Sequence, residues 1–273
     1  MTDIGKRPFS DTDFARLDGN PDALFYSKPR LVTHIDDAAC AALSGHYADF
    51  LRDGDRVLDV MSSCVSHLPA TWTPGEVVGH GMNTVELEAN PQLDSFFVQD
   101  LNKTQALPFE EASFDACLIA VSVQYLVNPI AVFMEICRIL RPGGQVAVSF
   151  SNRMFPTKAV AIWRESDNSG RCRLVAEYLG AIAHLKEIQI TDLSPQPGHR
   201  DPLLIASTLS LTVSVVESML PRRPEWLEKV SLLETQMRAL SADDETVSRR
   251  TTPTPTGSDS GTTNGQEALP ADF

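Results

Sequence analysis

The stretch Leu140-Arg141-Pro142-Gly143-Gly144, followed by the apolar run at residues 145–150, decides the fold prediction. Residues 130–140 before it carry apolar side chains at helical spacing, and a helix does not continue through Pro142. The two glycines then turn the chain into a strand. Another apolar run, residues 114–123, precedes the helix. This order of strand, helix and strand predicts a parallel, doubly wound α/β sheet.

The rest of the chain supplies further strands and helices in alternation. A helix is expected around residues 35–43, with Asp36 and Asp37 in its first turn, and a mostly helical stretch over 162–183. Two late strands are expected on either side of a Pro-Gly loop. The expected strands are residues 56–60, 76–79, 95–99, 114–120, 145–150, 184–192 and 203–208.

Composition limits the classes of function. The 273-residue chain has a formal net charge of −13 and no block rich in Lys or Arg, which argues against binding nucleic acid or an anionic membrane. The apolar stretch at residues 203–220 contains too many hydroxyl groups to span a bilayer well. The N-terminal residues are polar and acidic, unlike a signal peptide. We therefore expect a cytoplasmic protein.

The five cysteines are widely spaced, and none forms a Cys-x-x-Cys pair. They are typical of small buried side chains in a reducing compartment. Cys64 and His67 lie close in sequence, but further metal ligands are not evident beside them, so no metal site is expected.

A second group of motifs points to a family. Val98-Gln99-Asp100-Leu101-Asn102 is followed by Leu107-Pro108-Phe109 and then by Ser113-Phe114-Asp115. Together with the Pro-Gly-Gly turn, this spacing resembles class I S-adenosylmethionine-dependent methyltransferases of the type 11 group. The resemblance implies a Rossmann-like, mostly parallel seven-stranded sheet with an antiparallel last strand and helices on both faces. It also implies S-adenosyl-L-methionine as cofactor and S-adenosyl-L-homocysteine as product.

On this basis we divide the chain into four parts. Residues 1–24 are expected to be a flexible N-terminal arm, and 25–208 the methyltransferase domain with an N-terminal substrate-cap helix. Residues 209–240 are expected to form a helical extension. The Thr-, Pro- and Ser-rich residues 241–273 are expected to be a disordered tail.

The loop after the first strand departs from the family pattern. Asp59 fits the acidic position of the family motif, but Met61, Ser63 and Val65 stand where glycines are usual. The resemblance includes a branch with a Ser-Ser turn, here Ser62-Ser63. In one interpretation these serines bind the methionine part of the cofactor. In the other, Met61 and Val65 fill the crevice and the serines only cap a helix.

The next two strands supply the remaining cofactor candidates implied by the resemblance. Gly81 occupies the position of the acid that usually holds the ribose. Met82 could pack on adenine and Asn83 could bond a hydroxyl, although Asn83 is equally a helix cap. Glu86 could reach across from the next turn. Asp100 would accept a hydrogen bond from the adenine amino group, and Leu101 would donate its N–H to the ring. Ser122 is the last cofactor candidate.

Residues on both sides of the domain are candidates for the acceptor site. In the family, the segment after the fourth strand separates the methyl group from the acceptor, and Gln124 and Tyr125 lie there. An N-terminal segment often covers the cofactor, which makes Tyr26, Arg30 and His34 substrate contacts. His34, Gln124 and Tyr125 are the catalytic candidates, with His34 as general base. Alternatively, Arg30 pairs with a surface acid and His34 caps the next helix.

We therefore expect methyl transfer to an O, N or S nucleophile of a small molecule. The competing hypothesis is a degenerate methyltransferase fold that serves as a binding or regulatory subunit. Residues 224–240 carry apolar side chains at helical spacing and are the candidate face for a partner protein or a homodimer.

Overall fold

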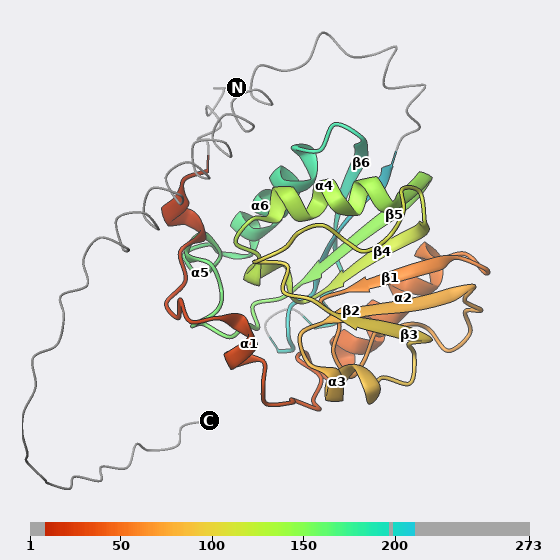
Figure 1. Ribbon diagram of the computed structural model, residues 1–273, viewed down its shortest axis with the longest axis horizontal. Coiled ribbons are helices and arrows are strands. Elements are labelled where there is room, and N and C mark those ends of the chain that lie inside the picture. The colour runs from red at the N-terminus through yellow and green to blue at the C-terminus, as the bar shows by residue number, and fades with distance from the viewer. Residues whose placement is uncertain (1–8, 197–198, 211–273) are drawn as a thin grey trace, which may run out of the picture. The chain divides into compact units, whose positions relative to one another are not determined.

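The computed structural model describes residues 9–196 and 199–210. Seven strands form one sheet in the order β3-β2-β1-β4-β5-β7-β6 (Figure 1). Neighbours from β3 to β5 pair in parallel, whereas β7 lies antiparallel between β5 and β6. The strands are β1 (Arg56–Val60), β2 (Glu76–Gly81), β3 (Ser95–Val98), β4 (Phe114–Ala120), β5 (Leu140–Phe150), β6 (Leu185–Asp192) and β7 (Leu204–Ser210). The predicted fold class is confirmed.

The helices also follow the predicted order. Asp36 begins α2, where its carboxylate accepts a hydrogen bond from the N–H of Ala39. The helical stretch predicted at 162–183 forms two separate helices, α5 and α6. The helices are α1 (Asp22–Phe25), α2 (Asp37–Phe50), α3 (Thr84–Glu88), α4 (Pro129–Ile139), α5 (Ala161–Arg164) and α6 (Asn168–Gly180), with 3-10 turns η1 (Asp11–Phe14) and η2 (Val123–Tyr125).

The Pro-Gly-Gly turn lies within strand β5. Helix α4 ends at Ile139, earlier than predicted, because Leu140 already pairs with Phe114 of β4. The pairing then shifts, and regular register resumes at Gln145, opposite Ala116. Gly143 has a φ of 81°, which glycine adopts without steric cost. The turn therefore makes an irregularity in the strand and not a separate connection.

The sheet has a core on each face. Alternate residues of a strand point to opposite faces, so Cys117 and Ile119 join one cluster while Ala116 and Leu118 join the other. Helices α4 and α6 cover the first face and α2 covers the second (Figure 1). Both faces are apolar, as a parallel sheet requires.

The described part of the expected N-terminal arm, residues 9–24, packs against the domain. The rings of Phe9 and Phe14 lie 5.5 and 6.2 Å from the ring of Tyr178 on α6. The carbonyl of Ala15 accepts a hydrogen bond from the N–H of Ala161. Aromatic burial and main-chain bonding hold this segment in place, which composition alone does not indicate.

The remaining expectations concern the C-terminal part of the chain. Residues 211–273 lie outside the described residues. They include most of the expected extension, the expected 224–240 helix and the expected 241–273 tail. Within residues 9–196 and 199–210, no helix is both long and apolar enough to span a bilayer.

The core of α4 offers a test of the packing. Phe133 is fully buried between α4 and the sheet, whereas the adjacent Met134 is 48% exposed. We expect Phe133→Ala to lower the free energy of unfolding by about 3–5 kcal/mol, because it leaves a cavity. Met134→Ala, the matched control on the same helix, should change it by less than about 0.5 kcal/mol. Urea denaturation measures both; equal losses would contradict this packing.

Candidate functional site

A cavity of about 500 Å³ lies at the carboxyl ends of the parallel strands. This volume is typical of small-ligand sites, and this edge of an open α/β sheet is where such folds bind ligands. Most of the residues predicted for the site line it. They are Tyr26, His34, Asp59, Met61, Ser62, Ser63, Met82, Asp100, Leu101, Ser122 and Tyr125.

Three predicted site residues do not line this cavity. Asn83 caps α3, where its Oδ1 accepts from the N–H groups of Val85 and Glu86, so its capping interpretation holds. The Arg30 guanidinium donates to the carbonyl of Phe25 and lies 4.5 Å from the centre of that ring. The amide of Gln124 is buried and donates to the carbonyl of Val121. Each of these side chains supports the wall of the cavity and does not face it.

Asp59 lies at the end of β1 and is 1% exposed. Burial raises the pKa of its carboxyl group to about 6, although hydrogen bonds from Ser62 and Ser66 oppose the shift. The Ser62 hydroxyl donates to Asp59 Oδ2 at 2.6 Å. A buried carboxylate beside a cavity is strongly stabilised by a cation, so Asp59 is suited to receive a positively charged group.

The turn after β1 works without its usual glycines because His80 holds it. Met61 has a φ of 59°, a left-handed conformation that costs a residue with a side chain about 1–2 kcal/mol. Its N–H donates to His80 Nδ1 at 3.0 Å, and the N–H of Ser62 donates to the His80 carbonyl at 2.6 Å.

The ring of His80 is itself fixed. Since Nδ1 accepts, the ring proton is on Nε2, which donates to the Gln99 carbonyl at 2.9 Å. Burial lowers the pKa of His80 to about 4, so the ring is neutral. His80 was not singled out from the sequence, because its role comes from contacts across strands.

The same turn explains why residue 81 is glycine. A Cβ at Gly81 would lie 2.7 Å from the carbonyl oxygen of Ser62, closer than such atoms approach. An acid therefore does not fit at this position. Glu86, one helical turn further on, lines the cavity instead. Its Oε2 accepts from the Ser63 hydroxyl at 2.8 Å, and its Oε1 accepts from the N–H of Arg30 at 2.6 Å.

Asp100 lies in the loop after β3, at the other end of the cavity. Its Oδ1 accepts from the N–H of Asn102 at 3.0 Å, which fixes the orientation of the carboxylate. Its Oδ2 lies 3.9 Å from the ammonium of Lys103, which is mostly exposed. One oxygen of Asp100 is therefore left with a weak, solvent-screened contact and can accept a hydrogen bond from a ligand.

The loop after β4 presents an unpaired hydroxyl. Ser122 lines the cavity, and its buried Oγ has no hydrogen-bond partner among the described residues. Buried hydroxyls are normally paired, so a missing partner at a cavity wall indicates a ligand group. The preceding residue, Val121, has a φ of 50°, a strained conformation for a β-branched side chain.

Two imidazoles and two phenols line the remaining wall. Burial lowers the pKa of His34, and it lowers that of His67 to about 4 with a smaller contribution from His34. Both rings are thus neutral at pH 7. The Tyr125 hydroxyl accepts from the N–H of Phe155 at 2.8 Å, and burial raises the pKa of Tyr26. His67, which also has a strained φ of 57°, was not predicted as a site residue.

The structure, over the residues it describes, contains no group of three or more His, Cys, Asp or Glu side chains that could hold an ion. The five cysteines are free.

Comparisons with known proteins match part of the chain to a family of methyltransferase domains. Residues 77–148, from β2 to β5, match the family Methyltransf_11, described as "Methyltransferase domain". Residues 77–148 are thus similar to a methyltransferase domain. The resemblance noted in the sequence implies S-adenosylmethionine as the cofactor.

Individual relatives match only in part. The demethylmenaquinone methyltransferase of Mycobacterium sp. (strain KMS) is 33% identical over 123 residues, which is 43% of this chain and 50% of the relative. The biotin biosynthesis bifunctional protein BioHC of Teredinibacter turnerae is 43% identical over 49 residues, 18% of this chain and 9% of the relative. The chain spans half the length of the mycobacterial relative and less of the other.

Among solved structures, a putative S-adenosylmethionine-dependent methyltransferase from Listeria monocytogenes is similar with a TM-score of 0.47 and 12% identity. The alignment covers 65% of this chain and 100% of that one.

The residues present fit the cofactor. Three polar groups line one cavity: the buried Asp59 carboxylate, the Asp100 carboxylate with one weakly bonded oxygen, and the Ser122 hydroxyl, which has no partner among the described residues. They suit an ammonium, an amine and a further polar group, respectively. Glu86 supplies an acid on the wall where Gly81 does not.

The role of His80 is testable by replacing its ring. We expect His80→Phe to lower the free energy of unfolding by about 1–3 kcal/mol, because the N–H of Met61 loses its buried acceptor. His46→Phe is the matched control, since His46 Nε2 is buried and unpaired and its ring stacks on Phe50. The control should keep or gain stability. Equal melting temperatures of the two variants in thermal denaturation would contradict this role for His80.

Proposed function

We propose that this chain transfers a methyl group from S-adenosylmethionine to a small-molecule acceptor. The observation that carries the proposal is the placement of Asp59 and Asp100, at the ends of β1 and β3, in one cavity with the neutral imidazole of His34. The methyltransferase-domain match, residues 77–148, includes Asp100 and strands β3 and β4, but not β1 with Asp59.

The cofactor, when bound, supplies a methyl group on an electrophilic sulfonium. In our proposal Asp59 pairs with its amino group, and Ser62 and Ser63 line the methionine part. Asp100 accepts from the adenine amino group, Leu101 donates its N–H to the ring, and Met82 packs on it. Glu86 takes the ribose in place of an acid at position 81, and Ser122 donates its unpaired hydroxyl.

The acceptor lies, in this proposal, against Tyr26, His34 and Tyr125. A sulfonium is a good methyl donor, so the chain's main task is to align the acceptor and exclude water. His34 is neutral at pH 7 and accepts a proton from an acceptor hydroxyl. An amine or sulfur acceptor needs the alignment alone. The named acceptor of the mycobacterial relative, demethylmenaquinone, is a small molecule, which supports this class.

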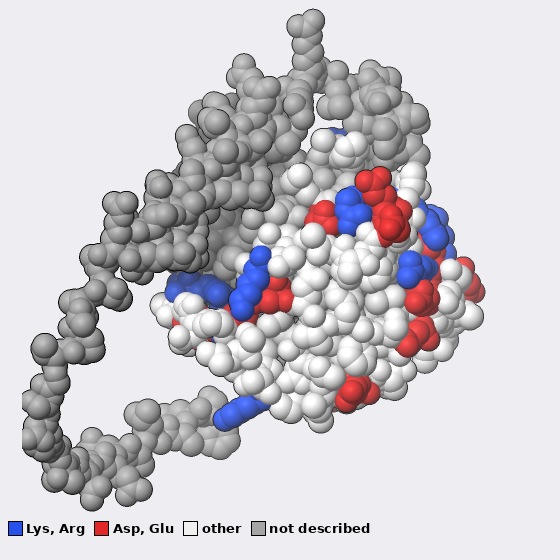
Figure 2. All heavy atoms as spheres, viewed as in Figure 1, with Lys and Arg blue, Asp and Glu red and all other residues white. Residues whose placement is uncertain are grey.

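Surface charge supports the same class of acceptor. Figure 2 shows acidic and basic side chains interspersed on the face in view, without a broad basic patch among the described residues. Together with the net charge of −13, this disfavours a nucleic-acid acceptor. The free cysteines suit a reducing compartment, so we propose a cytoplasmic enzyme.

Loss of the Asp100 carboxylate tests the cofactor site. We expect Asp100→Ala to weaken binding of S-adenosylmethionine and S-adenosylhomocysteine about tenfold or more, because a charge-assisted hydrogen bond is lost. Glu110→Gln, which removes an exposed carboxylate outside the cavity, should leave both dissociation constants unchanged. Isothermal titration calorimetry measures them. If the folded protein binds neither ligand at millimolar concentration, the enzyme proposal fails and the binding or regulatory role is favoured.

The raised pKa of Asp59 predicts a pH dependence of binding. The group is protonated below about pH 6 and ionised above it, and only the carboxylate pairs with a cationic amino group. We expect the dissociation constant of S-adenosylmethionine to be about tenfold larger at pH 5 than at pH 7. In Asp59→Asn, binding should be weaker at pH 7 and nearly independent of pH in this range. An equally steep profile in the variant would assign the dependence to another group.

A further inference from the structure

A buried ionic cluster beside the cavity joins the N-terminal segment, residues 16–25, to the domain. Lys158, in the loop between β5 and α5, is 0% exposed. Its ammonium lies 3.1 Å from a carboxylate oxygen of Asp18 and 3.1 Å from one of Asp22, and it donates to the Asn20 carbonyl at 2.8 Å. A buried charge requires such partners, so this cluster fixes residues 18–22 to the loop.

Asp22 accepts from three side chains in and beside this cluster. It is 4% exposed, and Arg16 Nη1 donates to both of its oxygens, at 2.6 and 2.7 Å. Burial alone would raise the pKa of Asp22, but hydrogen bonds from Arg16, Asn102 and Lys158 outweigh it and lower the pKa. With these donors the carboxylate has little capacity left for a ligand, although it lines the cavity.

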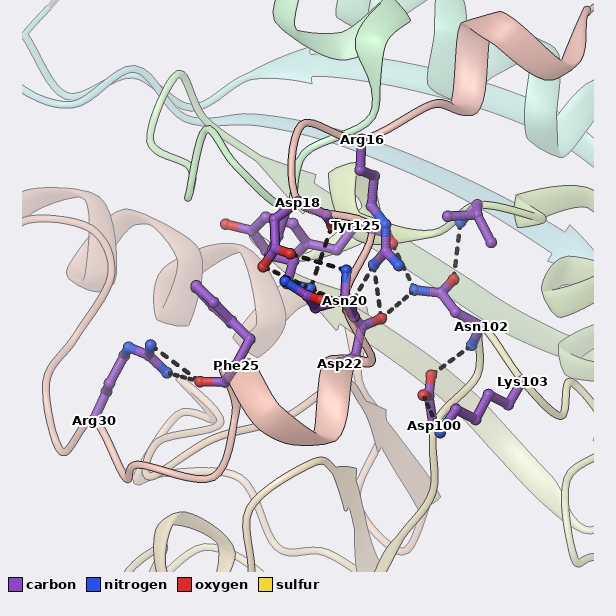
Figure 3. Close-up of polar contacts among 12 residues, drawn as sticks. Arg16, Asp18, Asn20, Asp22, Phe25, Arg30, Asp100, Asn102, Lys103 and Tyr125 are labelled. Atoms are coloured by element: carbon purple, nitrogen blue, oxygen red, sulfur yellow. Dashed lines mark hydrogen bonds and ion pairs between the residues drawn. The ribbon is translucent and has the colours of Figure 1, made fainter. Parts of the chain in front are cut away.

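The remaining donor to Asp22 leads to the proposed cofactor site. Asn102 Nδ2 donates to Asp22 Oδ2 at 2.8 Å and to the Tyr125 carbonyl at 2.9 Å. Asn102 Oδ1 accepts from the N–H of Val127, and its own N–H donates to Asp100 Oδ1 at 3.0 Å. Figure 3 shows this chain of contacts running from Arg16 through Asp22 and Asn102 to Asp100.

We propose that Asp22 is a positioning residue that couples the N-terminal segment to cofactor binding through Asn102 and Asp100. The inference rests on the proposed function, because it assigns Asp100 to the cofactor. Asp22 holds the Asn102 amide, Asn102 orients the Asp100 carboxylate, and Asp100 binds the adenine amino group. The same contacts hold residues 16–22 in place. Tyr26 and His34, which follow them in the chain, line the cavity on the proposed acceptor wall.

Coupling of this kind is reciprocal. If the N-terminal segment favours cofactor binding through Asp22, bound cofactor must stabilise the segment by the same factor. The acceptor wall is then best ordered when the donor is present. This order of events would keep an acceptor from binding productively at an empty cofactor site.

The test compares two carboxylates that share Lys158 but differ in one contact. Asp22→Asn removes a carboxylate that is bonded to Asn102; Asp18→Asn removes one for which no contact with Asn102 is found. We expect Asp22→Asn to weaken S-adenosylhomocysteine binding about tenfold, within the range of typical coupling between sites. The dissociation constant of Asp18→Asn should stay within about twofold of that of the unmodified chain, even if its melting temperature falls as much as that of Asp22→Asn. Calorimetry and thermal denaturation of the full chain give both values.

Hydrogen exchange provides a second measurement, made first on the unmodified chain and then on Asp22→Asn. We expect S-adenosylhomocysteine to slow exchange of the amides in residues 16–25, and Asp22→Asn to remove this protection. Unchanged exchange in residues 16–25 on saturation with S-adenosylhomocysteine would overturn the coupling. So would equal affinities of Asp22→Asn and Asp18→Asn. Failure of the unmodified chain to bind the ligand would instead overturn the proposed function, and the coupling with it.

Discussion

The hydrogen bond from the N–H of Met61 to His80 Nδ1 is the constraint on which the site depends. It holds a methionine in a conformation normally left to glycine, and so it shapes the turn after β1. That turn places the Ser62 carbonyl against Gly81, which excludes an acid there, and it brings Ser63 to Glu86. Two departures from the family pattern, the absent glycines and the absent ribose acid, thus have one physical cause.

Residues 16–22 beside the cavity are held by charge, in contrast to the strained turn after β1. Lys158 and Asp22 are buried, and the partly exposed Arg16 bonds to Asp22. Removal of any one of the three leaves an opposite charge with fewer partners in a medium of low dielectric constant. This explains why a polar N-terminal segment lies in a fixed place. In the proposed function, the strained turn forms the side for the methyl donor and the ionic cluster positions the side for the acceptor. Asn102 contacts the cluster at Asp22 and the proposed donor side at Asp100.

The fold could be predicted because it follows from patterns local in sequence. Apolar runs such as residues 114–120, and a helix that stops before Pro142, depend on neighbours along the chain. The predicted strands appear with ends shifted by at most two residues, except that β5 begins at Leu140 and not at residue 145. Asp59 and Asp100 could be placed because they match acidic positions of the family that the sequence resembles, at strand ends that meet at one edge of a parallel sheet. His80 and His67 could not, since their importance comes from contacts across strands or from backbone conformation. Arg30 and Gln124 were placed on the right segments, but their side chains bond to main-chain carbonyls instead of facing the cavity. The packing of residues 9–24 depends on Lys158, more than 130 positions away in the sequence.

The central claim is that the cavity at the ends of β1, β3 and β4 is the cofactor site of a methyltransferase. A crystal structure of the protein grown with S-adenosylhomocysteine tests it most directly. We expect the ligand in this cavity, with its amino group at Asp59, its adenine amino group at Asp100 and its sulfur facing the wall that carries His34. Ligand bound elsewhere on the molecule, or bound here with adenine away from Asp100, would contradict it.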